Sequence, residues 1–176
     1  MRVLKWLAIA IGVAVALMVV VVIGARFADG PIVIIPGGAL EAGELVSGTE
    51  PDFTFARDLP EMELQLVEPP QSRTIWLQVV DGKLYVVSGY MNSTLGKVWK
   101  QWPAQALLDG RAVVRIDGKR YERQLVRILD DVPLLEAIAA EVDRKYGAPL
   151  RADMAASGDA WFFALEPRNQ PNSPVD

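Results

Sequence analysis

The sequence predicts a mainly β (α+β) domain that follows a single N-terminal transmembrane helix. Three observations support this prediction. An apolar run without a charge extends from Trp6 to Ala25. Two pairs, Asp81-Gly82 and Asp117-Gly118, each separate two β-like segments, which is a strong signal for an antiparallel hairpin. One longer segment, between Asp131 and Gly147, instead repeats apolar residues at helical spacing.

The apolar run has the length of a bilayer span. About 20 residues rise roughly 30 Å as an α-helix, which matches the hydrocarbon core of a membrane. A cleaved signal peptide is the alternative, because the start MRVLK is basic and Gly24–Ala28 contains small residues. The run is longer than a usual signal-peptide core and no A-x-A site ends it, so an uncleaved anchor is favoured.

The residues around and within this run indicate its placement. Arg2 and Lys5 precede it and only Arg26 closely follows, which predicts a cytoplasmic N-terminus and an extracytoplasmic main domain. Small residues at four-residue spacing would let another transmembrane helix approach one face closely. Such residues are also common in membrane helices that have no partner. The face predicts a homodimer or docking to another transmembrane helix through Ala8, Gly12 and Ala16.

Composition excludes several kinds of site. The 176 residues include no Cys and no His, which removes the usual zinc ligands, a Cys nucleophile and a Ser-His-Asp triad. We therefore predict no metal site and name no catalytic residue; catalysis would use carboxylates, Lys, Tyr, Ser or Thr, or a cofactor. The segment after Arg26 holds 22 acidic and 15 basic residues, a net charge of −7, which argues against a nucleic-acid partner.

Composition also sets the expected boundaries. Residues 1–26 form the anchor, and residues 27–51 form a Gly/Pro-rich linker that would space the domain from the membrane. The folded domain occupies residues 52–168, and residues 169–176 form a disordered tail.

Six strands and two helices are expected within the domain. Period-two alternation or β-rich composition marks the strands, which are 61–66, 73–80, 83–88, 111–116, 119–129 and 160–166. Pro103 suits the first turn of a short helix over Trp102–Leu108. Asp130 or Asp131 caps a longer helix that Gly147 ends.

The order of these elements, with the strings DGKLYVVSG, KVWKQWPAQALLDGRAVVRIDGKRYE and FFALEPR, resembles the FMN-binding split β-barrel superfamily. Its members include pyridoxamine phosphate oxidase-like proteins and deazaflavin-dependent nitroreductases and quinone reductases. The resemblance covers about Asp52 to Arg168. It implies a six-stranded antiparallel split β-barrel, usually dimeric, with FMN or a deazaflavin bound at the dimer interface.

The resemblance also implies a site for the cofactor phosphate. In such families, cations at the head of one strand and just before the short helix hold this group. The matching positions here are Arg73, Thr74, Ser88, Lys97 and Lys100. Cations and hydroxyl donors near the start of a helix are also a physically reasonable anion site. Three aromatic residues could offer flat surfaces to the ring system, namely Tyr90, Trp99 and Trp102.

Other features argue for a barrel that binds no cofactor. Glu68–Ser72 replaces the Gly- and cation-rich turn that active members commonly carry, and the short helix starts with Trp-Pro. Lys97 and Lys100 can be interpreted more simply as solvated charges of a loop. Trp99 and Trp102 can likewise be interpreted as anchors in the core or at a dimer interface. The arginines of segment 111–127 would mostly form an outward charged face.

Two functions follow from these readings. The first is a single-pass membrane-anchored oxidoreductase that uses FMN or a deazaflavin, because the resemblance supplies both the fold and a phosphate site. The second is a non-catalytic accessory or scaffold subunit of a membrane protein complex, with the small-residue face of the anchor as its docking surface.

Overall fold

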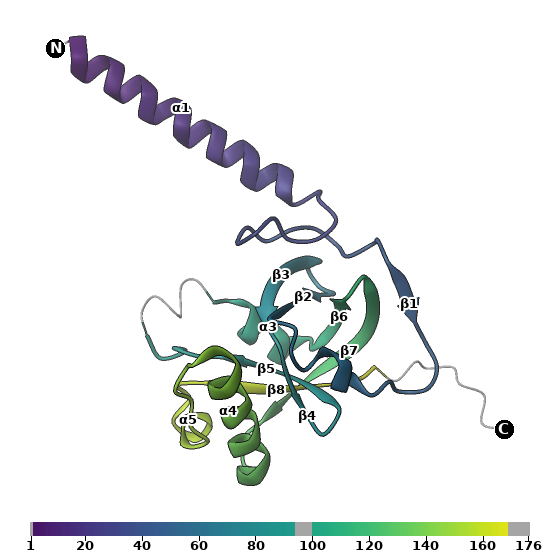
Figure 1. The fold of residues 1–176 in the computed structure, drawn as a ribbon. Helices are drawn as coiled ribbons and strands as arrows, with labels where there is room; N and C mark the ends of the chain where they lie inside the picture. Colours follow the sequence, from purple (N-terminus) through teal and green to yellow (C-terminus); the bar gives the residue numbers. More distant parts are fainter. Residues whose placement is uncertain (1, 94–99, 169–176) are drawn as a thin grey trace.

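A computed structural model describes residues 2–93 and 100–168 of the chain (Figure 1). Lys97, Trp99 and the expected tail 169–176 lie outside these described residues. The elements in chain order are α1 (Arg2–Ala25), β1 (Glu44–Val46), η1 (Phe53–Ala56), β2 (Glu61–Leu66), β3 (Gln71–Trp76), β4 (Gln78–Val80), β5 (Lys83–Ser88), α3 (Trp102–Leu108), β6 (Arg111–Ile116), β7 (Lys119–Ile128), α4 (Val132–Tyr146), α5 (Asp153–Ser157) and β8 (Trp161–Pro167).

One curled sheet contains all the described strands. Its order is β3-β2-β6-β7-β8-β5-β4 with antiparallel pairing along this path, and β1 adds in parallel to β7. The two ends of the order, β3 and β4, are consecutive in the chain and separated only by Leu77. The predicted mainly β, antiparallel split-barrel class is therefore confirmed. The predicted strand number of six is wrong, because Leu77 divides the expected strand Arg73–Val80 and β1 lies outside the expected domain.

Both Asp-Gly pairs form the predicted hairpin turns. Asp81 and Gly82 have φ values of +49° and +71°, and Asp117 and Gly118 have +48° and +73°. Positive φ at both central residues is what a type I′ turn requires, and this turn matches the twist of the strands that it joins.

Two apolar clusters stabilise the two faces of the sheet. The cluster inside the barrel includes Phe53, Leu64 and Phe163, each fully buried. The second cluster lies where α4 and α5 cover the outer face, and Phe162 of β8 packs there against Ile138 of α4. Because successive side chains of a strand point to opposite faces, β8 supplies a buried aromatic ring to each cluster. Burial of one such ring contributes about 1.5–3 kcal/mol.

The two predicted helices begin and end as expected. α3 starts at Trp102 with Pro103 in its first turn, and Trp102 packs on Phe163 with ring centroids 5.6 Å apart. The Asp131 side chain caps α4 by accepting a hydrogen bond from the Leu134 amide, and Gly147 ends the helix at φ +60°. The short helices η1 and α5 were not predicted from the sequence.

Helix α1 projects away from the barrel (Figure 1). It is long and apolar enough to cross a membrane, and Ala25 at its end is its one buried residue. Ala8, Gly12 and Ala16 are exposed on it. Docking of another helix to this face stays a prediction.

The segment predicted as a spacer lies against the barrel. Gly37 exchanges backbone hydrogen bonds of 3.0 and 3.1 Å with Ser72 of β3, and the Leu40 amide donates to Gln65 Oε1 at 2.7 Å. Farther along, β1 pairs with β7. The chain between the anchor and the barrel is therefore attached at several points, and we expect little freedom between the two.

The prediction that the arginines of segment 111–127 mostly face outward is wrong for its central members. Arg115 pairs with Asp29 at 3.0 Å and with Glu63, and Arg120 donates to the carbonyl oxygens of Gly43 and Leu40. Arg123 is only 3% exposed. These arginines hold the segment before the barrel in place, and their partners are too distant in the sequence for local patterning to reveal.

Arg123 makes the most buried of these contacts. Its guanidinium lies 4.8 Å from the centroid of the Phe53 ring and donates to both Glu50 carboxylate oxygens, at 2.7 and 2.8 Å. A buried charge that loses its counterion is strongly destabilising, whereas replacement of the charge by an apolar side chain costs less.

We predict that Glu50→Gln lowers the free energy of unfolding by about 1–3 kcal/mol, because Arg123 then keeps a buried charge without a carboxylate. Urea unfolding followed by circular dichroism measures this change. Glu44→Gln removes an exposed carboxylate from β1 nearby and is the matched control, for which we expect no change. Equal effects of the two substitutions would contradict the assignment.

Candidate functional site

The structure contains a cavity of about 1040 Å³. Its wall includes residues of β3 and β5, two strands that do not pair with each other in the described part of the chain. Residues of β4, α3 and α5, the end of α4 and the loops around Ile34, Tyr90 and Asp159 also line it. A volume of this order is sufficient for a cofactor or another small molecule.

Four of the five residues predicted to bind a cofactor line this cavity. Arg73 and Thr74 come from β3, Ser88 from the end of β5, and Lys100 from the residues just before α3. The fifth, Lys97, lies outside the described residues. The structure thus brings together side chains from three parts of the sequence, whereas their role toward a cofactor stays a prediction.

Arg73 is the least satisfied polar side chain of the four. One guanidinium nitrogen donates to Gln71 Oε1 at 3.2 Å, but Nε is buried and has no hydrogen-bond partner among the described residues. Burial lowers the pKa of Arg73 to about 10, so the group remains a cation at neutral pH. A buried polar group without a partner costs free energy, which an anion in the cavity would recover.

Lys100 places a second positive charge at the cavity. Its Nζ donates to the Gly89 carbonyl oxygen at 2.9 Å and lies 5.6 Å from the centroid of the Tyr90 ring. Burial lowers the pKa of Lys100. An ammonium group has three protons to donate, so after the bond to Gly89 it retains capacity for a ligand.

The cavity also contains one carboxylate that its neighbours hold in the charged form. Asp159 accepts hydrogen bonds from Asn92 Nδ2 at 2.7 Å and from Ser157 Oγ at 2.9 Å. The bond from Asn92 is the largest cause of the lowered pKa of Asp159. The described wall thus carries two cations and one carboxylate, a balance that favours an anion near Arg73 and Lys100.

Sequence reasoning missed two residues of the wall. Gln78 of β4 is 1% exposed, and its Oε1 has no partner among the described residues. Trp76 is 50% exposed and stacks on Tyr146, with centroids 4.2 Å apart and ring planes 4° from parallel. No local pattern distinguishes these residues from ordinary strand residues. Trp102, which was named as a ring surface, lines the cavity and also packs in the core cluster, so that role stays a prediction.

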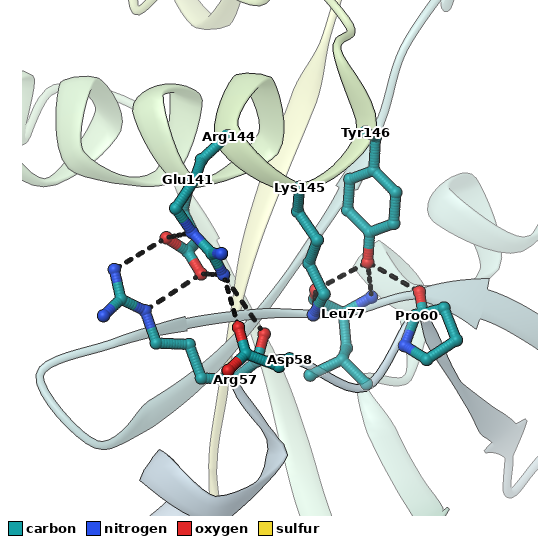
Figure 2. Close-up of polar contacts among 8 residues, drawn as sticks. All are labelled: Arg57, Asp58, Pro60, Leu77, Glu141, Arg144, Lys145 and Tyr146. Carbon is teal, nitrogen blue, oxygen red and sulfur yellow. Dashed lines mark hydrogen bonds and ion pairs between the residues drawn. The ribbon is translucent and has the colours of Figure 1, made fainter.

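The end of α4 fixes the chain where β3 passes into β4, as Figure 2 shows. The Tyr146 hydroxyl accepts a hydrogen bond from the Leu77 amide at 3.1 Å. Its single proton is within reach of two acceptors, the carbonyl oxygens of Pro60 at 2.7 Å and of Leu77 at 2.9 Å. Lys145 Nζ also donates to the Leu77 carbonyl oxygen, at 3.0 Å. These bonds satisfy backbone groups that the interrupted strand leaves unpaired. Burial raises the pKa of Tyr146 to about 12, so the hydroxyl keeps its proton.

An ion-pair network one turn earlier holds the same helix (Figure 2). The Glu141 carboxylate is 6% exposed and accepts hydrogen bonds from Arg57, at 3.2 Å, and from Arg144, at 2.6 and 2.9 Å. Arg144 also pairs with Asp58 at 3.1 Å. The hydrogen bonds from Arg144 are the largest cause that lowers the pKa of Glu141 to about 2. Two successive turns of α4 thus contact the segment from Arg57 to Pro60, which leads into β2.

We predict that Tyr146→Phe lowers the free energy of unfolding by about 1–3 kcal/mol, because the buried polar groups at Leu77 lose a partner. Hydrogen exchange of the Leu77 amide should accelerate more than that of Val79, whose neighbouring strand pairing is intact. The control is Tyr85→Phe, since the Tyr85 hydroxyl makes no hydrogen bond among the described residues. Unchanged exchange at Leu77 would show that Tyr146 does not hold this position.

Comparisons with known proteins give similarity in structure alone. No family model matches the chain, and no curated protein is significantly similar in sequence. A conserved hypothetical protein from Mycobacterium tuberculosis is 14% identical with a TM-score of 0.47, covering 74% of this chain and 98% of its own. A Listeria innocua protein, provisionally named a pyridoxamine 5'-phosphate oxidase, is 13% identical with a TM-score of 0.42, covering 62% and 85%. An F420 reductase is 15% identical with a TM-score of 0.40, covering 69% and 97%.

The name of the Listeria innocua protein, pyridoxamine 5'-phosphate oxidase, also belongs to one of the protein classes that the sequence of this chain resembles. All three TM-scores are below 0.5, so the similarity assigns neither a family nor a ligand to this chain.

Proposed function

We propose that the cavity between β3 and β5 binds FMN or a deazaflavin, and that the chain is a membrane-anchored protein of oxidoreductase type. One observation carries the proposal. Arg73 presents a buried Nε without a hydrogen-bond partner among the described residues, in the wall of a cavity of about 1040 Å³. Such a group is suited to a phosphate, whose oxygens accept charge-assisted hydrogen bonds.

The other residues of the wall fit the same kind of ligand. Thr74 and Ser88 add hydroxyl groups, which donate to the Val33 carbonyl oxygen and to Met91 Sδ, and Lys100 adds the second cation. Ile75 and Val87 supply apolar surface. Gln78 offers a buried acceptor oxygen without a partner among the described residues, which suits an N–H group of a polar ring.

A bound flavin or deazaflavin supplies hydride transfer, so the chain itself need not contain a nucleophile or an acid–base pair. The side chains of the cavity bind the cofactor and orient it, and the apolar wall excludes water from the ring. This division suits a chain without His or Cys.

The membrane part of the proposal depends on α1. Its length and apolar character suit a bilayer span. Arg2 and Lys5 before the span favour a cytoplasmic N-terminus and an extracytoplasmic barrel. We further propose a homodimer, or docking to another transmembrane helix, through the small-residue face that contains Ala8, Gly12 and Ala16.

We predict that the full chain in detergent binds FMN or a deazaflavin with micromolar affinity, about −8 kcal/mol, in a fluorescence titration. Riboflavin lacks the phosphate and should bind more weakly than FMN. Failure of both cofactors to bind would reject the proposal. That result would favour the non-catalytic accessory role, which co-purification of a partner in mild detergent would then test.

We predict that Arg73→Gln weakens binding of the phosphorylated cofactor by roughly 10- to 100-fold, because one charge-assisted interaction contributes about 1.5–3 kcal/mol. Riboflavin binding should change little. Arg151→Gln removes an equal charge from an exposed pair with Asp153 outside this cavity, so it is the matched control. Equal losses for FMN and riboflavin would show that Arg73 supports the fold rather than the phosphate.

A further inference from the structure

The chain between α1 and β1 makes a small loop with an exposed apolar tip. Two backbone hydrogen bonds, of 3.0 and 2.9 Å, join Ile32 to Ile35 and close the loop. Val33 and Ile34 at the tip are each 81% exposed, and Phe27 before the loop is 87% exposed. No charged residue occurs from Gly30 to Leu40. Exposed apolar side chains next to each other, such as those of Val33 and Ile34, commonly mark a site of interaction.

Neighbouring contacts hold this tip in a strained conformation. Val33 has φ +56°, a region that β-branched residues rarely adopt. The Thr74 hydroxyl donates to the Val33 carbonyl oxygen at 3.3 Å. Gly37 packs so closely on Gly30 that a Cβ at Gly37 would lie 1.7 Å from the Gly30 oxygen. Strain of this kind persists only where the surroundings impose it, so the exposure of the tip is built into the fold.

The loop is also attached to the end of α1. The Gly38 amide donates to the Ala28 carbonyl oxygen at 3.0 Å, and the amides of Phe27 and Ala28 continue the hydrogen bonding of the helix. A Cβ at Gly38 would lie 2.5 Å from the Arg26 carbonyl oxygen. In Figure 1 the loop lies beside the last turn of α1, between this helix and β3. The tip therefore has a fixed place near the point where the helix would leave a bilayer.

The same loop forms part of the cavity wall. Ile34 and Pro36 line the cavity together with Arg73 and Thr74 of β3. Ile34 is thus both an exposed tip residue and one side of the cavity mouth.

We infer that this tip, Val33 and Ile34 with Phe27, inserts into the interfacial region of the bilayer that α1 spans, and so holds the cavity mouth against the membrane surface. The inference rests on the membrane span of the proposed function. Continuity with α1 identifies the lipid surface, rather than another protein, as the occupant. The absence of charge in the loop and the cation Arg26 beside the span suit the boundary between acyl chains and headgroups.

Spin labelling tests this inference directly, because the chain contains no Cys and a single introduced Cys carries the only label. Full-length Ile34→Cys is labelled with a nitroxide and reconstituted in vesicles of phosphatidylcholine and phosphatidylglycerol. Lys83→Cys, at the exposed first residue of β5, is the aqueous control, and Val13→Cys, within α1, is the lipid control. Faster relaxation of the nitroxide in the presence of oxygen indicates that the label lies in lipid. Faster relaxation in the presence of a water-soluble nickel chelate indicates that the label is exposed to water.

We expect the label at position 34 to be several-fold less accessible to the nickel chelate than the label at position 83. Equal accessibility at 34 and 83, with the label at 13 protected, would overturn the inference and leave the anchor intact. Nickel access at 13 as well would reject the span itself and the inference with it. The readout involves no flavin, so failure of cofactor binding leaves it interpretable. A thermal melt of each labelled variant confirms that the barrel is folded.

Discussion

The contact between the Tyr146 hydroxyl and the backbone of Leu77 determines the geometry on which the candidate site depends. β3 and β4 are consecutive in the chain but lie at opposite ends of the strand order, so the chain must leave one edge of the sheet and join the other at a single residue. Backbone groups at such a break need partners when they are buried. Tyr146 and Lys145 supply them, while the Glu141 network fixes the helix that carries both side chains.

This break has consequences for the cavity. Because β3 and β5 do not pair in the described part of the chain, side chains from both strands line a common cavity, and residues of α3 and of the end of α4 also line it. Two buried polar atoms in its wall, Arg73 Nε and Gln78 Oε1, lack partners among the described residues. Buried polar groups without a partner cost free energy, and a ligand with both an anion and a polar ring would satisfy these two. The loop that carries Ile34 connects this space with the end of the membrane helix.

Patterns of a few adjacent residues in the sequence were sufficient to predict the turns, the helix cap and the short helix. The two Asp-Gly turns, the Asp131 cap and the short helix at Pro103 all depend on a few adjacent residues, and the structure contains each of them. The break at Leu77 was not predictable, because its stabilising partner is 69 positions away. Arg123 and Glu50 are likewise 73 positions apart. Arg73, Thr74, Ser88 and Lys100 were identified through resemblance to a family rather than through spacing, and Gln78 and Trp76 had no signal at all.

A crystal structure of the full chain with bound FMN tests the central claim most directly, namely that the cavity at the break binds a phosphorylated cofactor through Arg73. The account predicts a phosphate oxygen about 2.7–3.2 Å from Arg73 Nε, with Lys100 in the same shell and the ring against the wall that contains Gln78. A structure in which Arg73 Nε bonds to a protein acceptor while FMN lies elsewhere would contradict it.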